Sequence, residues 1–459
     1  MTTDRLVYLD HSATTPVASE VVEAMLPYLT SCFGNASGAY SLARKSRGGL
    51  ERARTTVADR IGARSHEIVF ASGGSESDNL AIRGVAHAWR AAGNAGGHVI
   101  TSAVEHEAVL ATAHCLEHEG FDVTVVGVDE MGRVRVDEVL GAVRSDTCLV
   151  SLMLANNEVG TLQPVAEVGA ALRPRDIRVH TDAVQAGAWL DIDVDALNVD
   201  ILSLSAHKFY GPKGVGILYV RDGTMLEPTQ TGGGQERHRR AGTENVAGAV
   251  GLAVALDCAA ADRAATVPRL TGLRDRLIDA LTADPSIRLT GHRTERMPNH
   301  ASFCIADVRA DVLLLGLDMH GICASSGRAV ARPVGDGRAG RAGERGAAVQ
   351  PRAKHDGRGH RPCAGGAAGA GGTAARGWGG AALRRLVVLQ TFDPLRPPRG
   401  PKAGHQPPPP PLRGGRGQRP PRHDPRSRLK HEGRRHRLRH RRQVLAPRGR
   451  RGRLPPARL

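Results

Sequence analysis

The stretch ILSLSAHKFYGPKGVGILYV, residues 201–220, joins two apolar segments through a polar turn. The segments at 201–204 and 216–219 are short runs rich in branched apolar residues, bounded by Ser, Gly and Pro, which is the pattern of buried strands. Lys208 lies just beyond the first of them. A lysine that merely extends from a loop into water is the ordinary explanation. The end of a buried strand is nevertheless a poor place for a surface charge, so this stretch bears on both fold and chemistry.

Short apolar runs alternate with helical patterns on the N-terminal side of this stretch, from Tyr8 onward. Such alternation is typical of βαβ units and a parallel sheet, and the continuous apolar character of the runs indicates burial on both faces. We therefore predict an α/β fold whose large domain holds a mostly parallel sheet. Helices are expected at 17–29 and 46–61, and further strands at 68–71, 98–101, 124–126, 148–153 and 178–181.

A second, smaller α/β domain is predicted after this one. A helical stretch at roughly 245–265 leads out of the large domain, and leucines near helical spacing indicate an amphipathic helix at 269–281. Alternating segments follow at 301–305 and 312–315. The expected organisation is an N-terminal segment 1–15, a large domain 16–262, a partial small domain 263–327 and a tail 328–459.

The tail differs sharply in composition from the rest of the chain. It holds 33 Lys and Arg against 6 Asp and Glu, whereas the preceding residues hold 30 against 40, so the net charge of +17 comes from the tail. Only 17 of its 132 residues are Leu, Ile, Val or Phe, which predicts disorder. Its Arg, Gly, Ala and Pro bias is expected of GC-rich DNA translated out of frame. Our hypothesis is that the reading frame changes at or just after Gly327.

Polar residues follow several of the predicted strands. In open parallel sheets, ligands bind beyond the carboxyl ends of the strands. The segment 72–79 (SGGSESDN) opens a helix, whose N–H groups and partial positive charge suit a phosphate. Asp182 could keep a pyridinium nitrogen protonated, and Lys208 suits a Schiff-base lysine with a desolvated amine. With His106 and Asn157 after two more strands, the set describes a site for pyridoxal 5′-phosphate (PLP).

In this order the motifs resemble those of the cysteine desulfurases in the class V aminotransferase group. The resemblance covers roughly residues 6–327 and implies a PLP-dependent enzyme of the type I transferase fold, with L-cysteine as substrate. The matching motifs are YLDHSATTP at 8–16, FGNAS at 33–37, the loop 72–79, Glu105-His106, NNE at 156–158, DAVQ at 182–185, SAHKFYGPKG at 205–214 and GGGQER at 232–237.

The resemblance also implies roles for single residues. Lys208 would form the Schiff base and move protons at the substrate α-carbon, and His106 would stack on the cofactor ring; these two are the catalytic candidates. Asp182 would pair with the ring nitrogen and Gln185 would reach the phenolic oxygen. The remaining cofactor contacts would come from Gly74, Ser75, Ser205 and His207 at the phosphate, from Asn157 beside the ring, and from Thr243, which would reach the phosphate of the partner subunit.

A contact from Thr243 to a partner's site implies a homodimer. The family's reaction leaves a protein persulfide. Its sulfur passes to acceptor proteins, such as an iron–sulfur scaffold, for iron–sulfur cluster assembly or for tRNA thiolation. Metal-binding in the context of iron–sulfur cluster assembly is therefore expected, although no metal-ligand set is predicted within the chain.

The chain departs from the family at the nucleophile. The family carries a Ser-Ser-Gly-Ser-Ala-Cys type turn, whereas Ser325-Ser326-Gly327 is followed here by Arg328-Ala329-Val330. Val330 therefore stands where the cysteine is expected, and we predict impaired activity. Cys323 and Cys363 are the weaker candidates to replace it. The downstream arginine that grips the substrate carboxylate in the family has no recognisable counterpart.

Two other functions stay open. A selenocysteine lyase or another class V enzyme depends less on the missing cysteine, and the Arg-rich tail could bind nucleic acid without sequence preference. Seven scattered cysteines without a CxxC pair argue against disulfides and a zinc knuckle. The N-terminus shows no basic and apolar leader, and no apolar run approaches the roughly 20 residues of a membrane span. A cytoplasmic protein without membrane contact is expected.

Overall fold

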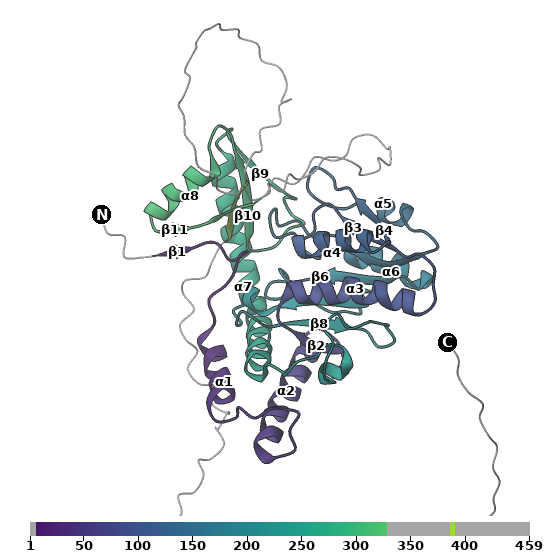
Figure 1. Cartoon of the computed structure of the whole chain (residues 1–459). Helices are drawn as coiled ribbons and strands as arrows, with labels where there is room; N and C mark the ends of the chain where they lie inside the picture. Colours follow the sequence, from purple (N-terminus) through teal and green to yellow (C-terminus); the bar gives the residue numbers. More distant parts are fainter. Residues whose placement is uncertain (1–5, 328–385, 391–459) are drawn as a thin grey trace, which may run out of the picture. The chain divides into compact units, whose positions relative to one another are not determined.

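The computed structural model describes residues 6–327 and 386–390. The large domain is built on a seven-stranded sheet with the strand order β2-β8-β7-β6-β5-β3-β4 (Figure 1). Only β8 runs antiparallel to its neighbours, so the sheet is mostly parallel as predicted. Its strands are β2 (Ile68–Ala71), β3 (His98–Ser102), β4 (Asp122–Val126), β5 (Thr147–Ser151), β6 (Arg178–Asp182), β7 (Ile201–Ser205) and β8 (Gly216–Val220).

Both faces of this sheet are buried, because successive residues of a strand point to opposite sides. On one face Val99 and Leu149 pack against α3 (Gly74–Ala91) and α4 (Glu107–His118). On the other face Ile100 and Val150 join a larger core, to which the remaining helices contribute. These are α1 (Ser19–Thr30), α2 (Ser41–Arg60), α5 (Val136–Gly141), α6 (Val165–Leu172) and the first part of α7 (Val246–Thr282).

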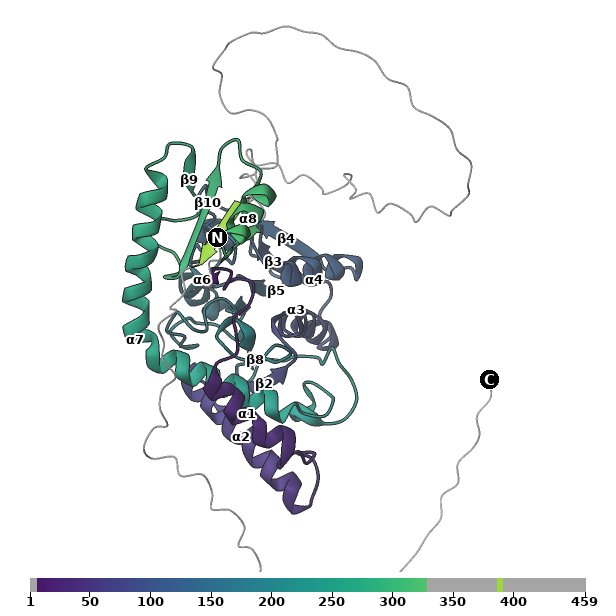
Figure 2. The same cartoon turned by 90° about the vertical axis from the view of Figure 1, so that its left-hand side faces the viewer.

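Helix α7 connects the large domain to the small one (Figure 2). Its 37 residues form one helix, not the two separate helices expected from the sequence. Pro268 lies inside it. The fixed φ of proline is compatible with a helix, and its missing N–H removes only one backbone hydrogen bond, so proline here does not end the helix.

The small domain contains a four-stranded sheet in the order β12-β13-β10-β9. The expected segment at 301–305 is confirmed as β10, but residues 312–315 are helical and not a strand-like alternating segment. They belong to α8, whose outer side carries Val312, Leu315 and Met319. The small-domain elements are β9 (Ile287–Leu289), β10 (His300–Ile305), α8 (Ala310–Met319), β11 (Ile322–Cys323), β12 (Ser325–Gly327) and β13 (Leu386–Gln390).

Two strands of the small domain come from distant parts of the chain. β1 (Val7–Tyr8) pairs in parallel with β11, which places Tyr8 opposite Cys323. β13 lies between β12 and β10, where Ser302 is opposite Val388. Residues 386–390 were expected to belong to the disordered tail, whose average composition conceals this one apolar run. The predicted disorder of the other tail residues concerns positions outside the described part of the chain.

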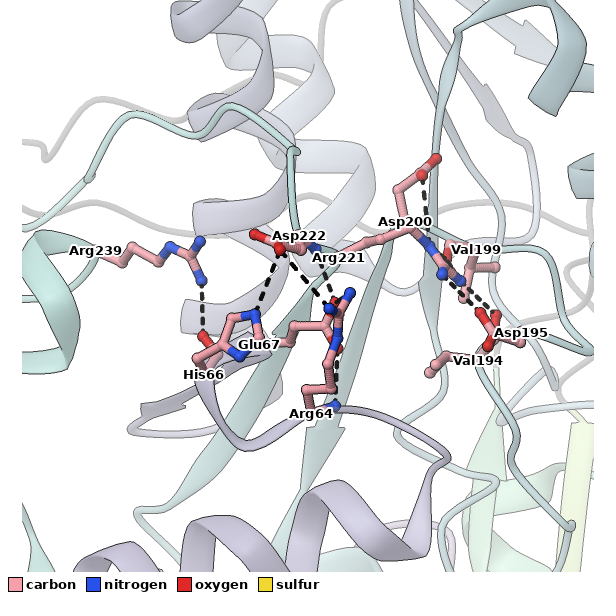
Figure 3. A network of polar contacts seen from close by, with 10 residues as sticks. All are labelled: Arg64, His66, Glu67, Val194, Asp195, Val199, Asp200, Arg221, Asp222 and Arg239. Carbon is pink, nitrogen blue, oxygen red and sulfur yellow. Dashed lines mark hydrogen bonds and ion pairs between the residues drawn. The ribbon is translucent and has the colours of Figure 1, made fainter.

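The edge of the large sheet at which β2 and β7 begin carries a network of paired polar groups (Figure 3). Arg221 donates hydrogen bonds to the backbone oxygen of Val199 at 2.9 Å and to Asp195 Oδ1 at 2.6 Å. Glu67 Oε1 accepts the backbone N–H of Asp222 at 2.8 Å. These groups satisfy one another, so their role is to close this end of the sheet.

Candidate active site

A cavity of about 460 Å³ lies at the opposite edge, where the parallel strands end. Its position follows from the fold, because the loops after parallel strands converge at one edge of the sheet. Nine of the ten residues that the sequence predicted for the cofactor site line this cavity: Gly74, Ser75, His106, Asn157, Asp182, Gln185, Ser205, His207 and Lys208. Thr243 is not among the lining residues.

Lys208 lies on the short helix η3 (Ala206–Lys208), directly after β7. Its Nζ donates hydrogen bonds to the backbone oxygens of Ser12 and, at 2.9 Å, Ala13. Burial lowers the pKa of Lys208 to about 8, against the opposing effect of Asp182 and Asp10. The amine is therefore far more easily deprotonated than an ordinary lysine, as a nucleophile toward a carbonyl group requires.

The segment around Ser12 supports this lysine from the other side. Gln185 Nε2 donates to the backbone oxygen of Ser12 at 3.0 Å, and the Thr15 side chain donates to the backbone oxygen of His207 at 2.9 Å. Ser12 and Ala13 also line the cavity; they stand in the motif at 8–16 but were not predicted as site residues. Their contribution comes from backbone carbonyls, which any residue type supplies.

Asp182 is the last residue of β6 and is 6% exposed. Its Oδ1 accepts the backbone N–H of Val184 at 2.9 Å. Burial raises the pKa of Asp182, and this effect is opposed by the Val184 hydrogen bond and by His106 and Lys208. Because an unpaired charge is costly to bury, a cationic partner would stabilise the ionised form of this buried carboxyl group.

The first turn of α3 forms the anion-binding end of the cavity. Gly74 and Ser75 are its first two residues, and their backbone N–H groups have no partner within the helix. A Cβ atom at Gly74 would lie 2.8 Å from Val184 Cγ2, so only glycine leaves this space open. Ser205 and His207 line the cavity as well. The arrangement combines helix N–H donors with polar side chains, which is the combination that binds a phosphate.

His106 caps the N-terminus of α4. Its Nδ1 accepts the backbone N–H of Ala108 at 3.1 Å, which fixes the ring at the cavity and leaves Nε2 as the protonated nitrogen of the neutral ring. Asn157 lies in the loop after β5. The preceding residue, Asn156, holds this loop by donating to Val104 O at 2.8 Å and by accepting the N–H groups of Glu158 and Val159.

Two buried carboxyl groups, one lining the cavity and one close to its residues, were not assigned a role from the sequence. Asp78, in the second turn of α3, lines the cavity and is 1% exposed. Glu105 accepts hydrogen bonds from Ser102 at 2.6 Å and Met153 N at 3.0 Å, and burial raises its pKa to about 8. Both residues stand in the quoted motifs, but a motif does not reveal that a carboxyl group is buried.

Thr243 lies outside the cavity in an exposed turn. The turn is tied to the phosphate-binding end, because Arg240 pairs with Glu76 of α3 at 2.8 Å. Further back, Glu236 forms a buried ion pair with Arg54 at 2.7 Å and accepts the N–H of Phe70 at 3.0 Å. The segment that carries Thr243 is thus firmly attached to the large domain.

Comparison with known proteins agrees with this geometry. The model of the class V aminotransferase family matches residues 7–346. A cysteine desulfurase IscS of Methanosarcina thermophila is 50% identical over 328 residues, which cover 72% of this chain and 80% of the relative. The chain belongs to the cysteine desulfurases of the class V aminotransferase family.

Solved structures place this desulfurase in the same group. A NifS-like protein superposes with a TM-score of 0.68 at 37% identity, over 70% of this chain and 87% of that protein. A structure described as SspA in complex with cysteine gives a TM-score of 0.61 at 37% identity, over 70% and 88% of the two chains. Both comparisons confirm the predicted α/β type I transferase fold and its PLP cofactor.

The residues present fit PLP. The cavity offers a lysine amine, a buried carboxylate and, at Gly74, a helix N-terminus that no Cβ obstructs. In this family PLP supplies an electron sink for the α-carbon of a bound amino acid. Asp182 would hold the ring nitrogen, α3 the phosphate and Lys208 the aldehyde carbon.

The nucleophile loop reaches the cavity but ends there in the described structure. Ser325, Ser326 and Gly327 line the cavity, as the sequence analysis expected for the start of this loop. Val330 and Cys363 lie outside the described residues. Cys323 is half-buried on β11 and does not line the cavity. Among the described residues no cysteine faces the cofactor site.

Proposed function

We propose that this chain retains the cofactor site of a cysteine desulfurase but has lost the residue that accepts sulfur. The observation that carries the proposal is the convergence of Lys208, Asp182, His106 and the α3 N-terminus on one cavity, with Ser325–Gly327 at its side. Position 330, three residues beyond, is valine.

Different described side chains bind the cofactor and transfer the proton. Lys208, with its lowered pKa, moves a proton at the substrate α-carbon. Asp182 would keep the ring nitrogen of the cofactor protonated, Gln185 would bind its phenolic oxygen and His106 would cover its ring. Gly74, Ser75, Ser205 and His207 would bind its phosphate, and Asn157 would contact the ring.

Sulfur transfer needs a thiolate, and the described residues that line the cavity include no cysteine. A cysteine thiolate would attack the substrate sulfur and form an S–S bond, while the electrons of the broken C–S bond return to the substrate carbon, which leaves as alanine after protonation. A valine side chain has no lone pair to begin this step. The natural substrate is L-cysteine, in line with the cysteine complex of SspA. A version of this chain that carries the nucleophilic cysteine would transfer its persulfide sulfur to a partner, either a sulfur-acceptor protein or an iron–sulfur scaffold protein.

We place the functional unit as a homodimer in the cytoplasm. On α1 and just after it, Val22, Leu26, Leu29 and Phe33 are 53–67% exposed and lie at spacings of four, three and four residues. Such a stripe covers one side of a helix and is an unusual apolar surface for a monomer. Thr243, exposed on a firmly held turn, supplies a phosphate contact across the interface. None of the described helices has the length and apolar character that a membrane span requires.

A selenocysteine lyase is the second candidate, and the valine at 330 favours it. Selenium leaves carbon more readily than sulfur, so removal of selenium depends less on a protein thiolate. Comparing alanine formation from selenocysteine and from cysteine separates the two functions.

Nucleic-acid binding by the tail would depend on residues outside the described structure. It is tested by deleting residues 328–459: if salt-sensitive binding to nucleic acid is unchanged in the shortened chain, the tail is not the binding site.

The test measures cofactor loading and persulfide formation separately. We expect the chain to load PLP, seen as the visible absorbance of the lysine-bound cofactor, and to form no protein persulfide with L-cysteine. The matched control is a chimera that carries the sequence of the Methanosarcina relative after Gly327, which should form the persulfide. If the original chain forms a persulfide, the proposal is wrong, and Cys323→Ser then shows whether Cys323 accepts the sulfur.

A further inference from the structure

Asp78 and Asp182 bring two carboxyl groups together at the floor of the cavity. An oxygen of each and a ring nitrogen of His106 all lie within 4.8 Å of one another. Asp78 is 1% exposed and Asp182 is 6% exposed. One oxygen of Asp78, Oδ1, is buried and has no hydrogen-bond partner within the described structure. Two buried carboxylates this close cannot both remain ionised without cations for each.

The positive charge of the Lys208 amine acts on Asp182 and not on Asp78. His106 and Lys208 act on Asp182 and favour its ionised form. The acids that face Asp78 are Asp182 and Glu105, and the rings of His180 and His106 lie nearby. The Ser203 hydroxyl is hydrogen-bonded to the Asp78 carboxyl group and opposes the rise of its pKa. Burial raises the pKa of Asp78 well above its ordinary value, and the charge of Asp182 raises it further.

Among the described residues, His180 is the basic side chain that comes within 4 Å of Asp78. Its Nε2 lies 3.7 Å from Asp78 Oδ1, beyond hydrogen-bond range. Both ring nitrogens are already engaged, Nδ1 with Ser151 Oγ at 2.8 Å and Nε2 with Ser203 Oγ at 3.0 Å. The ring is fully buried, and burial lowers the pKa of His180 to about 3. At neutral pH His180 therefore carries no charge that could pair with Asp78.

We propose that Asp78 is held as the neutral carboxylic acid, so that the single negative charge of the carboxyl pair rests on Asp182. Asp78 is then a positioning residue. Its proton keeps a second negative charge away from the cofactor ring and leaves Asp182 free to pair with the ring nitrogen. The inference rests on the cofactor site alone and does not depend on whether the chain turns over cysteine.

Infrared spectroscopy of the full chain without cofactor tests this at neutral pH. A protonated carboxylic acid gives a C=O stretch that ionised carboxylates lack, and labelling aspartate with ¹³C separates it from the band of a protonated Glu105. We expect a label-sensitive band in the unmodified chain that disappears in Asp78→Asn and persists in Asp182→Asn. Absence of the band, its survival in Asp78→Asn, or its loss only in Asp182→Asn would each overturn the proposal.

A second measurement covers the case in which Asp78→Asn does not fold, as judged by circular dichroism. Asp78→Glu then decides, because the carboxylic acid band must lose its sensitivity to the aspartate label if residue 78 carries the proton, and must keep it if Asp182 does. In the cofactor-loaded chain the same band is expected to remain, since the ring nitrogen pairs with Asp182. Failure of the chain to bind PLP would count against the cofactor site but would leave the result from the cofactor-free chain intact.

Discussion

His300 Nε2 lies 3.1 Å from the backbone oxygen of Asn157, so a buried histidine of the small domain is hydrogen-bonded to the loop that carries a cavity residue. The oxygen can only accept, which makes Nε2 the donor. Nearby, Arg296 donates to Val159 O at 2.7 Å and Met297 N donates to Gly160 O at 2.8 Å. The small domain thereby fixes the shape of the loop between β5 and α6.

This contact predicts a loss of stability in acid. Burial lowers the pKa of His300 to about 3, whereas a histidine in the unfolded chain titrates near 6.5. The unfolded state therefore binds the proton first, and stability falls as the pH drops from about 6.5 toward 3. Each such histidine costs up to about 1.4 kcal/mol per pH unit in this range.

His300→Gln should reduce this pH dependence by one proton, because glutamine keeps an N–H donor and does not titrate. The measurement is the free energy of unfolding between pH 7 and 5 by denaturant titration. His118→Gln, on the exposed end of α4, is the control and should leave the slope as it is. An unchanged slope in His300→Gln would show that His300 is protonated in the folded chain.

Gly74→Ala should weaken cofactor binding. The added Cβ would lie 2.8 Å from Val184 Cγ2 and 3.7 Å from Ser205 Cβ, so it crowds the phosphate end of the cavity. Overpacking of this kind costs about 1–3 kcal/mol, which corresponds to a roughly 5- to 150-fold increase in the Kd for PLP. Absorbance titration of the cofactor-free chain measures it. Gly272→Ala on α7 meets no atom within 4 Å and should leave the Kd unaltered.

Nine of the ten site residues could be predicted because the family resemblance selects them, and each lies at or after the end of a strand, where the fold brings them to one edge of the sheet. Asp78 could not, since its importance comes from burial beside Asp182, a property of the packed structure. Thr243 has a predicted role only across a dimer interface, so a single chain cannot bring it to the cavity.

Elements of the small domain were harder to predict for physical reasons. Pro268 conceals the continuity of α7, because proline usually ends a helix although its φ permits one. The run Val312–Leu313–Leu314–Leu315 has no clear period, and short apolar runs do not distinguish helix from strand. The strand at 386–390 is separated in sequence from its partners, and strand pairing over such distances leaves no local signal.

Helix α8 should promote self-association of the chain. Val312, Leu315 and Met319 are 57, 66 and 85% exposed, and their spacing places them on one side of the helix. Val308, just before the helix, is 47% exposed. Exposed apolar stripes of this kind are aggregation sites. Leu315→Glu should raise the soluble yield and reduce the fraction of large species in sedimentation velocity, with PLP loading retained.

The half-buried neighbour Leu314 provides the contrast. Leu314→Glu places a charge against the small domain and should lower the unfolding temperature and the soluble yield. If both glutamate variants behave alike, the exposed stripe is not the cause of association.

Lys208 should react with aldehydes at a pH at which ordinary lysines are still protonated. Burial lowers its pKa to about 8, and Asp182 and Asp10 counteract part of that effect. Below pH 8 the ammonium form dominates and cannot attack a carbonyl, so the rate of PLP loading should rise with pH and level off above about 8. Asp182→Asn removes an anion that stabilises the ammonium form, so the midpoint should move to lower pH. Because Asp182 would also contact the cofactor ring, this variant is best followed with a small amine-reactive reagent and mass spectrometry of the Lys208 peptide.

Lys45, exposed on α2, is the internal control, and its labelling should be the same in both chains. A midpoint that stays in place in Asp182→Asn would mean that the carboxylate does not act on the lysine, and a midpoint near 10.4 in the unmodified chain would mean that the amine is not desolvated.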